Sequence, residues 1–267
     1  MINFAELWAY RDLFQLIVRR DTTIKYRQTI LGPLWLIIQP LVLAVVFSGV
    51  FGAVGGLPTD GVPRPLFYLA GLVPWAYFSQ VFAQVAGVLQ ANAHIFSKVY
   101  FPRLIIPLST IASGLVALTI QLLCFIAIRF WYMFSTPEAV SFGGWSSFLA
   151  LPFALLLLMA FSLGAGLWMS VLTAKYRDLT QLTPFLVQIL MYATPLIFPL
   201  SSVPEKYRLL ASLNPLAVVL ESFRGAVFGS SSVTVGQYAA AFLVTAILLV
   251  SGLRVFGVVE RNVIDSI

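Results

Sequence analysis

The stretch RRDTTIKYRQTILGPLWLIIQP, residues 19–40, decides the fold class of this chain. Its first half carries the N-terminal collar, which consists of Arg19, Arg20, Lys25 and Arg27. After Arg27 the next charged residue is Asp60, so the apolar run that begins at Leu34 is long enough to cross a bilayer of about 30 Å. A cationic segment that leads into such a run is typical of the cytoplasmic end of a first transmembrane helix. The stretch therefore predicts an integral membrane protein.

The composition of the whole chain agrees with this prediction. Of its 267 residues 60% are hydrophobic and only 10% are charged, whereas soluble domains carry about a quarter charged residues. The net charge of +6 comes from basic residues in short segments between apolar runs, without a cluster of interleaved aromatic residues. We interpret this charge as a sign of topology and of contact with lipid headgroups, and not of nucleic-acid binding.

Residues 1–32 are predicted to form a cytoplasmic interface region that precedes a permease domain at 33–267. Within it, residues 3–18 have the spacing of an amphipathic helix that lies along the membrane, with Asn3 and Glu6 placed as a capping box. A second short helix is expected from Asp21 to Leu31, before a turn at Gly32 and Pro33.

Six uncharged runs in the chain are near the length of about 20 residues that a spanning helix needs. They lie at 34–54, 66–90, 104–129, 147–172, 182–200 and 238–256, and the charged residues within these bounds are Arg129 at the edge of the third run and Arg254 near the end of the last. Alternate segments between them hold eleven Lys and Arg residues against five, which places both termini in the cytoplasm. The sequence thus predicts an all-α, multi-pass protein with six transmembrane helices.

The segment 201–237 is the long external connection of this topology. It contains NPLAVVLESFRGAVFG, residues 214–229, whose apolar residues form one helical face and whose Glu221 and Arg224 can pair at i, i+3. The piece is too short to span, so we expect a short helix that dips into the outer leaflet or lies on it.

Several kinds of chemistry are missing from the sequence. It has no G-x-x-x-x-G-K-[ST] loop for a nucleotide, no acidic residue in the predicted spans that could relay protons, and no cluster of metal ligands or catalytic triad. We therefore expect no cofactor in this chain. If the protein moves a substrate, the energy must come from a partner.

Four stretches in the chain resemble a known family. They are RRDTTIKYRQTILGPLWLIIQP, KVYFPRLIIPLS from Lys98, YRDLTQLTPFLVQILMYATPLIFP from Tyr176 and LNPLAVVLESFRGAVFG from Leu213. In order and topological position they resemble the membrane permease subunits of ABC transporters that export lipid-linked polysaccharides, such as O-antigen, capsule and teichoic acid.

This resemblance implies a function and a set of partners. The permease would be a homodimer in the bacterial inner membrane, joined by two separate ATPase subunits that bind ATP and Mg, and it would catalyse no bond change itself. Its substrate would be a polyprenyl-pyrophosphate-linked polysaccharide, with O-antigen as the first candidate and capsular polysaccharide, teichoic acid or another lipid or drug as the alternative. A channel and a membrane-embedded glycan-transferring enzyme are rival interpretations.

The resemblance also favours two cytoplasmic segments as the interface that couples the permease to the ATPase. These are the segment 92–103, with Asn92, His94, Lys98, Tyr100, Phe101 and Arg103, and the loop with Tyr176, Arg177 and Asp178. The alternative is that the basic residues only follow the positive-inside rule and that Arg177 and Asp178 form a solvated pair.

Two further groups are candidates for contact with the glycan. The aromatic residues Trp35, Tyr68, Trp75 and Tyr77 are suited to stacking on sugar rings in a channel, although aromatic belts and helix packing explain them as well. Asn214, Glu221 and Arg224 are candidates for an external gate, against the alternative that Glu221 and Arg224 only reduce the cost of charge near hydrocarbon.

Overall fold

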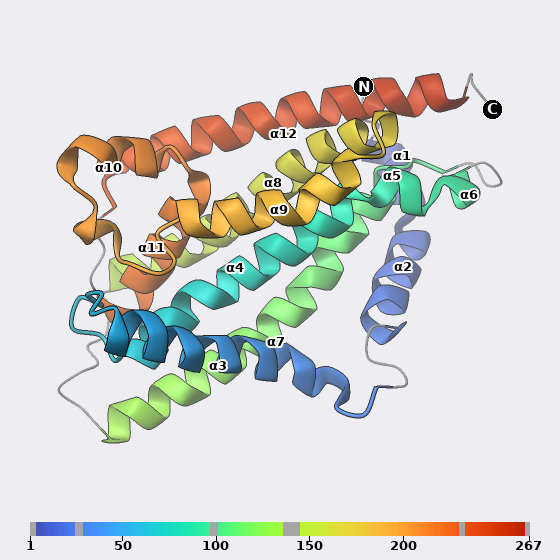
Figure 1. Cartoon of the computed structure of the whole chain (residues 1–267). Coiled ribbons are helices and arrows are strands. Elements are labelled where there is room, and N and C mark those ends of the chain that lie inside the picture. Colours follow the sequence, from blue (N-terminus) through green and yellow to red (C-terminus); the bar gives the residue numbers. More distant parts are fainter. Residues whose placement is uncertain (1–3, 25–28, 97–100, 136–144, 230–232, 265–267) are drawn as a thin grey trace.

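The computed structural model describes residues 4–24, 29–96, 101–135, 145–229 and 233–264, and over these residues it is built from helices without a strand. Figure 1 shows the long helices side by side, with shorter helices gathered at both ends. The all-α fold class predicted from the sequence is confirmed.

Five helical segments are long and apolar enough to cross a membrane in the part of the chain that is described. They are formed by α3 (Trp35–Phe47) with its continuation η2 (Ser48–Val54), α4 (Arg64–Ala86), α7 (Ile105–Ser135), α8 (Trp145–Lys175) and α12 (Val235–Ile264). Each overlaps one of the predicted spans. A short 3-10 turn, η1 (Gly32–Leu34), leads into α3 at the predicted Gly32-Pro33 turn.

The predicted fifth span, 182–200, differs from the helix observed. Helix α9 (Leu179–Ala193) has 15 residues and is therefore about 22 Å long, less than the thickness of the hydrocarbon core. It ends because Thr194 precedes Pro195, and a residue before proline is pushed out of the helical region; Thr194 has φ −99° and ψ 142°. The chain then continues through η4 (Leu200–Ser202) and α10 (Glu205–Ser212).

The N-terminal region also differs from its prediction. Two helices, α1 (Phe4–Ala9) and α2 (Arg11–Ile24), replace the expected helices at 3–18 and 21–31. Neither glycine nor proline occurs between Val18 and Ile24, so nothing interrupts the backbone hydrogen bonds there, and the Thr22 hydroxyl donates to the Val18 carbonyl within the same helix. Helix α2 packs beside α7 through its buried Ile17 and the neighbouring apolar residues.

Helix α4 lies at the centre of the bundle, and most of its residues are buried. It packs against α3, α7, α8 and α11 (Pro215–Phe228). Helix α8 also packs against α12, and there a Cβ atom added to Gly164 would lie 2.7 Å from the Leu249 nitrogen. Small residues allow such close approach of helix backbones in membranes. Gly164 therefore allows α8 and α12 to pack closely within one subunit.

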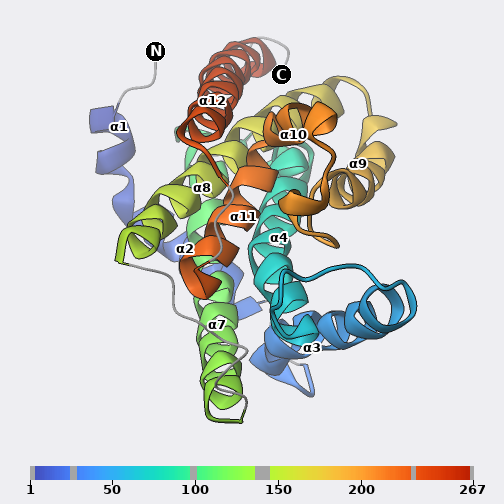
Figure 2. The same cartoon turned by 90° about the vertical axis from the view of Figure 1, so that its left-hand side faces the viewer.

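The short elements separate into two groups at opposite ends of the bundle. Helices α1, α2, α5 (Val88–Ala91) and α6 (Ala93–Phe96) lie at one end, together with the start of α9 and the last turns of α12 (Figure 1). Helices α10 and α11 lie at the other end, which faces the viewer in Figure 2. We call these the coupling end and the gate end, after the roles that the sequence predicts for them.

Candidate functional site

Helix α11 is the central element of the gate end. Every residue from Pro215 to Phe228 is buried. Its first turn is capped by Asn214, whose side-chain oxygen accepts a hydrogen bond from the Leu216 N–H at 3.1 Å. Its last turn ends at Gly229, which has φ +80° and therefore takes the left-handed conformation that suits glycine. The helix is thus fixed at both of its termini.

The location of α11 at the outer leaflet stays a prediction, but the structure shows that protein covers this helix. The predicted apolar face at Leu216, Leu220 and Phe223 is present, but the opposite face is buried as well, against α4, α8 and α12. A helix that is covered on all sides lies in a protein interior. Protein, and not lipid, therefore surrounds the two charged residues of α11.

Arg224 is 2% exposed and holds the backbone that follows α9. Its guanidinium donates hydrogen bonds to the carbonyls of Pro195 at 2.8 Å and Leu196 at 2.7 Å, with a longer one to Phe198 at 3.5 Å. The chain at 194–199 is not helical, so these carbonyls have lost their helical partners. We call Arg224, its three carbonyl partners, Glu221 and Phe67 the Arg224 cluster.

Two further contacts hold the charge of Arg224. Its Nη1 lies 3.6 Å from Oε2 of Glu221, which confirms the predicted i, i+3 pair, and its Cζ lies 3.8 Å from the centre of the Phe67 ring. A Cβ atom added to Gly71 would approach its Nη2 to 3.0 Å, so α4 leaves room for the guanidinium at that residue. The cluster therefore joins α4, α11 and the end of α9.

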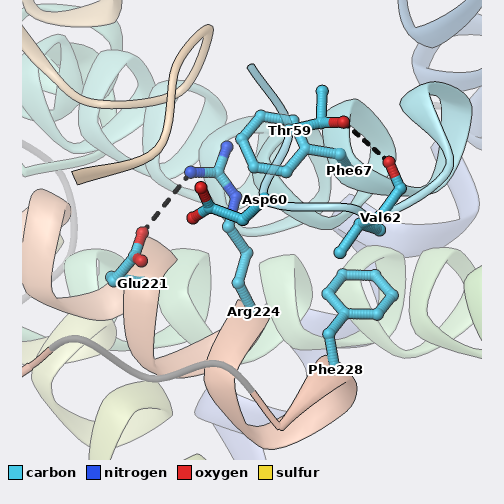
Figure 3. Close-up of a pocket in the computed structure, with 7 residues that line it drawn as sticks. All are labelled: Thr59, Asp60, Val62, Phe67, Glu221, Arg224 and Phe228. Atoms are coloured by element: carbon cyan, nitrogen blue, oxygen red, sulfur yellow. Dashed lines mark hydrogen bonds and ion pairs between the residues drawn. The ribbon is translucent and has the colours of Figure 1, made fainter. Parts of the chain in front are cut away.

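A small cavity borders the Arg224 cluster on its outer side. It has room for about one water molecule and is lined by Thr59, Asp60, Val62, Phe67, Glu221, Arg224 and Phe228. Figure 3 shows the Arg224 guanidinium between the Phe67 ring and the Asp60 carboxylate. Asp60 also accepts the hydroxyl of Ser201 at 3.0 Å, which ties the loop before α4 to the segment after α9.

A second arginine supports the other end of α11. Arg129 of α7, predicted at the edge of a span, is buried and donates to the carbonyl of Val227 at 2.9 Å. A cation at the end of a helix also suits its dipole. Beside it, the hydroxyls of Ser222 and Tyr238 lie 2.6 Å apart and join α11 to α12. Side chains from α7, α12 and α11 itself thus hold this short helix in one position.

The four aromatic channel candidates separate into two environments. Trp35, at the start of α3, is 45% exposed, whereas Tyr68, Trp75 and Tyr77 are between 0% and 6% exposed inside the single chain. In this conformation the three buried side chains belong to the core around α4 and lie on no face that a second subunit could reach. A channel role stays a prediction for all four, and for these three it would require a change in helix packing.

The coupling end brings together part of the segment 92–103. The Asn92 carbonyl accepts the N–H groups of Ile95 and Phe96 and so links α5 to α6. Arg103 is buried, with its Cζ 5.2 Å from the Phe96 ring centre, and the buried Phe101 ring lies 5.8 Å from the same ring. The side chains of Lys98, Tyr100 and His94 lie outside the described residues.

The second predicted coupling loop is open to solvent. Tyr176, Arg177 and Asp178 are all exposed, and the Lys175 Nζ lies 5.1 Å from the Tyr176 ring centre. Of the N-terminal collar, Arg19 and Arg20 are exposed on α2, where the Arg20 Nη2 lies 2.8 Å from an Asp21 oxygen. Lys25 and Arg27 lie outside the described residues.

One residue at this end was missed by the sequence analysis. The Gln90 side chain donates through Nε2 to the carbonyl of Thr173 at the end of α8, and its Oε1 accepts the hydroxyl of Thr180 in α9 at 3.1 Å. We call these three residues the Gln90 bridge. A single glutamine at the end of a predicted span has no sequence signature, so nothing in the pattern indicated this role.

Comparison with known proteins identifies a family and several relatives of this chain. A family model described as ABC-2 type transporter matches residues 12–228. The chain is 27% identical over 249 residues to the O-antigen export system permease protein RfbA of Klebsiella pneumoniae, covering 92% of this chain and 91% of the relative. It is 25% identical over 224 residues to a protein of the same name in Myxococcus xanthus, covering 82% and 81%.

A relative named for a different substrate matches to the same degree. The chain is 27% identical over 250 residues to the polysialic acid transport protein KpsM of Escherichia coli, covering 92% of this chain and 93% of the relative. The family model covers most of the chain, from the second residue of α2 through the whole of α11. The chain therefore belongs to the ABC-2 type transporter family.

Proposed function

We propose that this chain is the membrane permease of an ATP-driven exporter, and that its substrate is a lipid-linked polysaccharide of the O-antigen type. The observation that carries the proposal is the near full-length match to permeases named for the export of O-antigen and the transport of polysialic acid. The five long apolar helices supply the membrane-spanning body that such a permease needs. Export of another capsular polysaccharide, of teichoic acid or of a lipid or drug is the alternative.

The proposal includes separate ATPase subunits and a second copy of the permease. Two observations support a separate ATPase: membership of the ABC-2 family, and a sequence without a phosphate-binding loop of its own. ATP and Mg are thus assigned to the partner, and the permease itself is not an enzyme. A homodimer in the bacterial inner membrane, with both termini in the cytoplasm, completes the proposed assembly.

The exposed basic residues of the coupling end favour this end as the docking side for the ATPase. Arg19, Lys175 and Arg177 are exposed there, as is Arg254 in the last turns of α12. Basic residues also gather on the cytoplasmic side of membrane proteins, so topology and docking point to the same face. At the gate end, the Arg224 cluster with Asn214 holds the outer end of α9 and is our candidate for the frame of an external gate.

The proposal is tested by purifying the permease with its candidate ATPase subunit and reconstituting the complex in nanodiscs. ATP hydrolysis is then measured alone, with lipid-linked O-polysaccharide, and with lipid-linked polysialic acid. Stable co-purification with hydrolysis that rises on adding either glycan supports an exporter, and the stronger response identifies the substrate class. A permease that binds no ATPase subunit would overturn the proposal and favour a channel or a carrier independent of ATP.

A charge reversal tests the docking side in the same preparation. R177E changes an exposed residue of the coupling end, and K206E makes the same kind of change on an exposed residue of the gate end. We expect R177E to reduce co-purification of the ATPase, because complementary charge steers association, while K206E leaves it unchanged. Equal effects of the two substitutions would contradict the assigned orientation.

A further inference from the structure

Helix α9 has few buried side chains along its length and is joined to the bundle by side-chain hydrogen bonds at its two ends. Of its 15 residues Thr183 is the buried one, and large apolar side chains such as Phe185 and Ile189 are exposed. Its outer end continues into the carbonyls that Arg224 binds. Its inner end is joined to the Gln90 bridge through Thr180. Side-chain hydrogen bonds thus join both ends of the helix to the bundle, and partly buried residues such as Leu186 and Leu190 pack against the core between them.

The Gln90 bridge connects α9 to the segment predicted to receive the ATPase movement. Gln90 lies in α5, two residues before Asn92, where the segment 92–103 begins. Within the part of the chain that the structure describes, no other side-chain hydrogen bond joins the first two turns of α9 to another helix. Among the side-chain hydrogen bonds, the one from Thr180 to the Gln90 amide is therefore the one that can carry a displacement of α5 to the start of α9.

The same amide also bonds α8, which is tied to the end of α4. Its Nε2 donates to the Thr173 carbonyl, and the buried Thr173 hydroxyl donates to the carbonyl of Ala86 at 2.7 Å, which ties α8 to the end of α4. A primary amide carries a donor and an acceptor on one planar group, so one side chain can bond a carbonyl and a hydroxyl together. Rotation of that group changes both bonds at once.

We propose that Gln90 is the positioning residue that transmits movement of the segment 92–103 to the start of α9. This inference rests on the proposed function, because it takes the coupling end as the side on which the ATPase acts. Gln90 contacts neither the substrate nor the nucleotide in this scheme. It fixes α9 relative to α8 in one state and releases it in the other, and its exposed position lets water replace the lost bonds.

The test measures polysaccharide transported per ATP hydrolysed, in proteoliposomes that contain the complete permease–ATPase complex and lipid-linked O-polysaccharide. The variants are Q90A, T180V and the double variant Q90A/T180V. A fourth variant, T180S, keeps the hydroxyl and removes only the methyl group. The matched control is T119V, because the exposed Thr119 of α7 bonds only within its own helix, to the Leu115 carbonyl. Elution volume and ATPase content establish that each complex is assembled.

We expect Q90A and T180V each to lower transport per ATP by at least about 5-fold while ATP hydrolysis persists, which is the lower end of typical coupling between sites. The double variant should be no worse than either single variant, because both remove one connection. T180S and T119V should behave as the unchanged protein.

Unchanged transport per ATP in Q90A and T180V would overturn the inference, as would additive losses in the double variant. Neither result would affect the proposed function, since the complex would still assemble and export. Failure of the proposed function would give a different result. In that case the unchanged permease would bind no ATPase subunit or would not respond to the glycan. The two failures are therefore distinguishable in one set of preparations.

Discussion

Replacing Arg224 by methionine tests the gate end most directly. Methionine fills a similar volume but removes the donors to the carbonyls of Pro195, Leu196 and Phe198 and leaves Glu221 buried without its cation. An unsatisfied buried carbonyl costs about 1–3 kcal/mol, and an ion pair broken in the interior costs about 3–5 kcal/mol. Because these losses overlap, we expect R224M to lower the free energy of unfolding by about 4 kcal/mol.

The assay is thermal unfolding of the purified permease in detergent. Unfolding is measured as the fall, with rising temperature, in the fraction of the protein that remains monodisperse. For a chain of this size, about 4 kcal/mol corresponds to a fall of about 10 °C in the midpoint. The matched control is R208M in α10, because Arg208 donates to the carbonyls of Ser201 and Val203, both at 3.3 Å, near solvent. Water can replace those bonds, so its cost should stay below about 1 kcal/mol.

A double variant separates the charge from the hydrogen bonds. E221Q/R224M removes the carboxylate that has lost the Arg224 cation but still leaves the carbonyls without the Arg224 donors, so it should regain about 2 kcal/mol relative to R224M. If R224M unfolds at the same temperature as R208M, the carbonyls after α9 do not depend on Arg224 and the assigned frame of the gate is wrong. If E221Q/R224M regains nothing, the ion pair has no part in the cost.

Substitutions at two further sites test the packing of the bundle. The unfolding assay is used for Gln121, and the yield of folded protein is used for Gly164. Pro40 has no N–H to donate to the Leu36 carbonyl, and Gln121 of α7 supplies that bond at 3.1 Å, so Q121L should cost about 1–3 kcal/mol. In a P40A background, which restores the backbone donor, Q121L should cost clearly less; an equal cost in both backgrounds would contradict the assignment. G164A should sharply reduce the folded yield, because its Cβ would lie 2.7 Å from the backbone of α12, whereas G49A, with no atom within 4 Å, should not. Equal yields would show that the crossing of α8 and α12 tolerates a side chain.

The spanning helices could be predicted from the sequence because their signal is local. Long gaps between charged residues indicated α3, α4, α7, α8 and α12, and the observed helices overlap the predicted runs. The end of α9 was also visible in principle, because Thr194 precedes a proline and Phe198 precedes another. The prediction extended the span to residue 200 because hydropathy alone does not detect a break in the helix.

The setting of α11 could not be predicted, because burial on all sides depends on neighbours that are distant in the chain. The i, i+3 spacing of Glu221 and Arg224 predicted their ion pair correctly. Nothing in the local sequence indicated that Arg224 binds the carbonyls after α9 or stacks on Phe67. The aromatic candidates show the same limit, since Tyr68 and Trp35 look alike in sequence but differ completely in burial. Side chains that act on distant backbone leave no pattern.

The two ends of α9 are held by bonds of different strength, and this difference gives a direction to any movement of the helix. At the gate end the bonds come from a buried guanidinium, and charged donors in a dry interior form the stronger hydrogen bonds. At the coupling end the bond between Gln90 and Thr180 is neutral and exposed, so water can compete for it. A force applied to α5 therefore displaces the inner end of α9 before its outer end. The Arg224 cluster is the fixed point about which that displacement occurs.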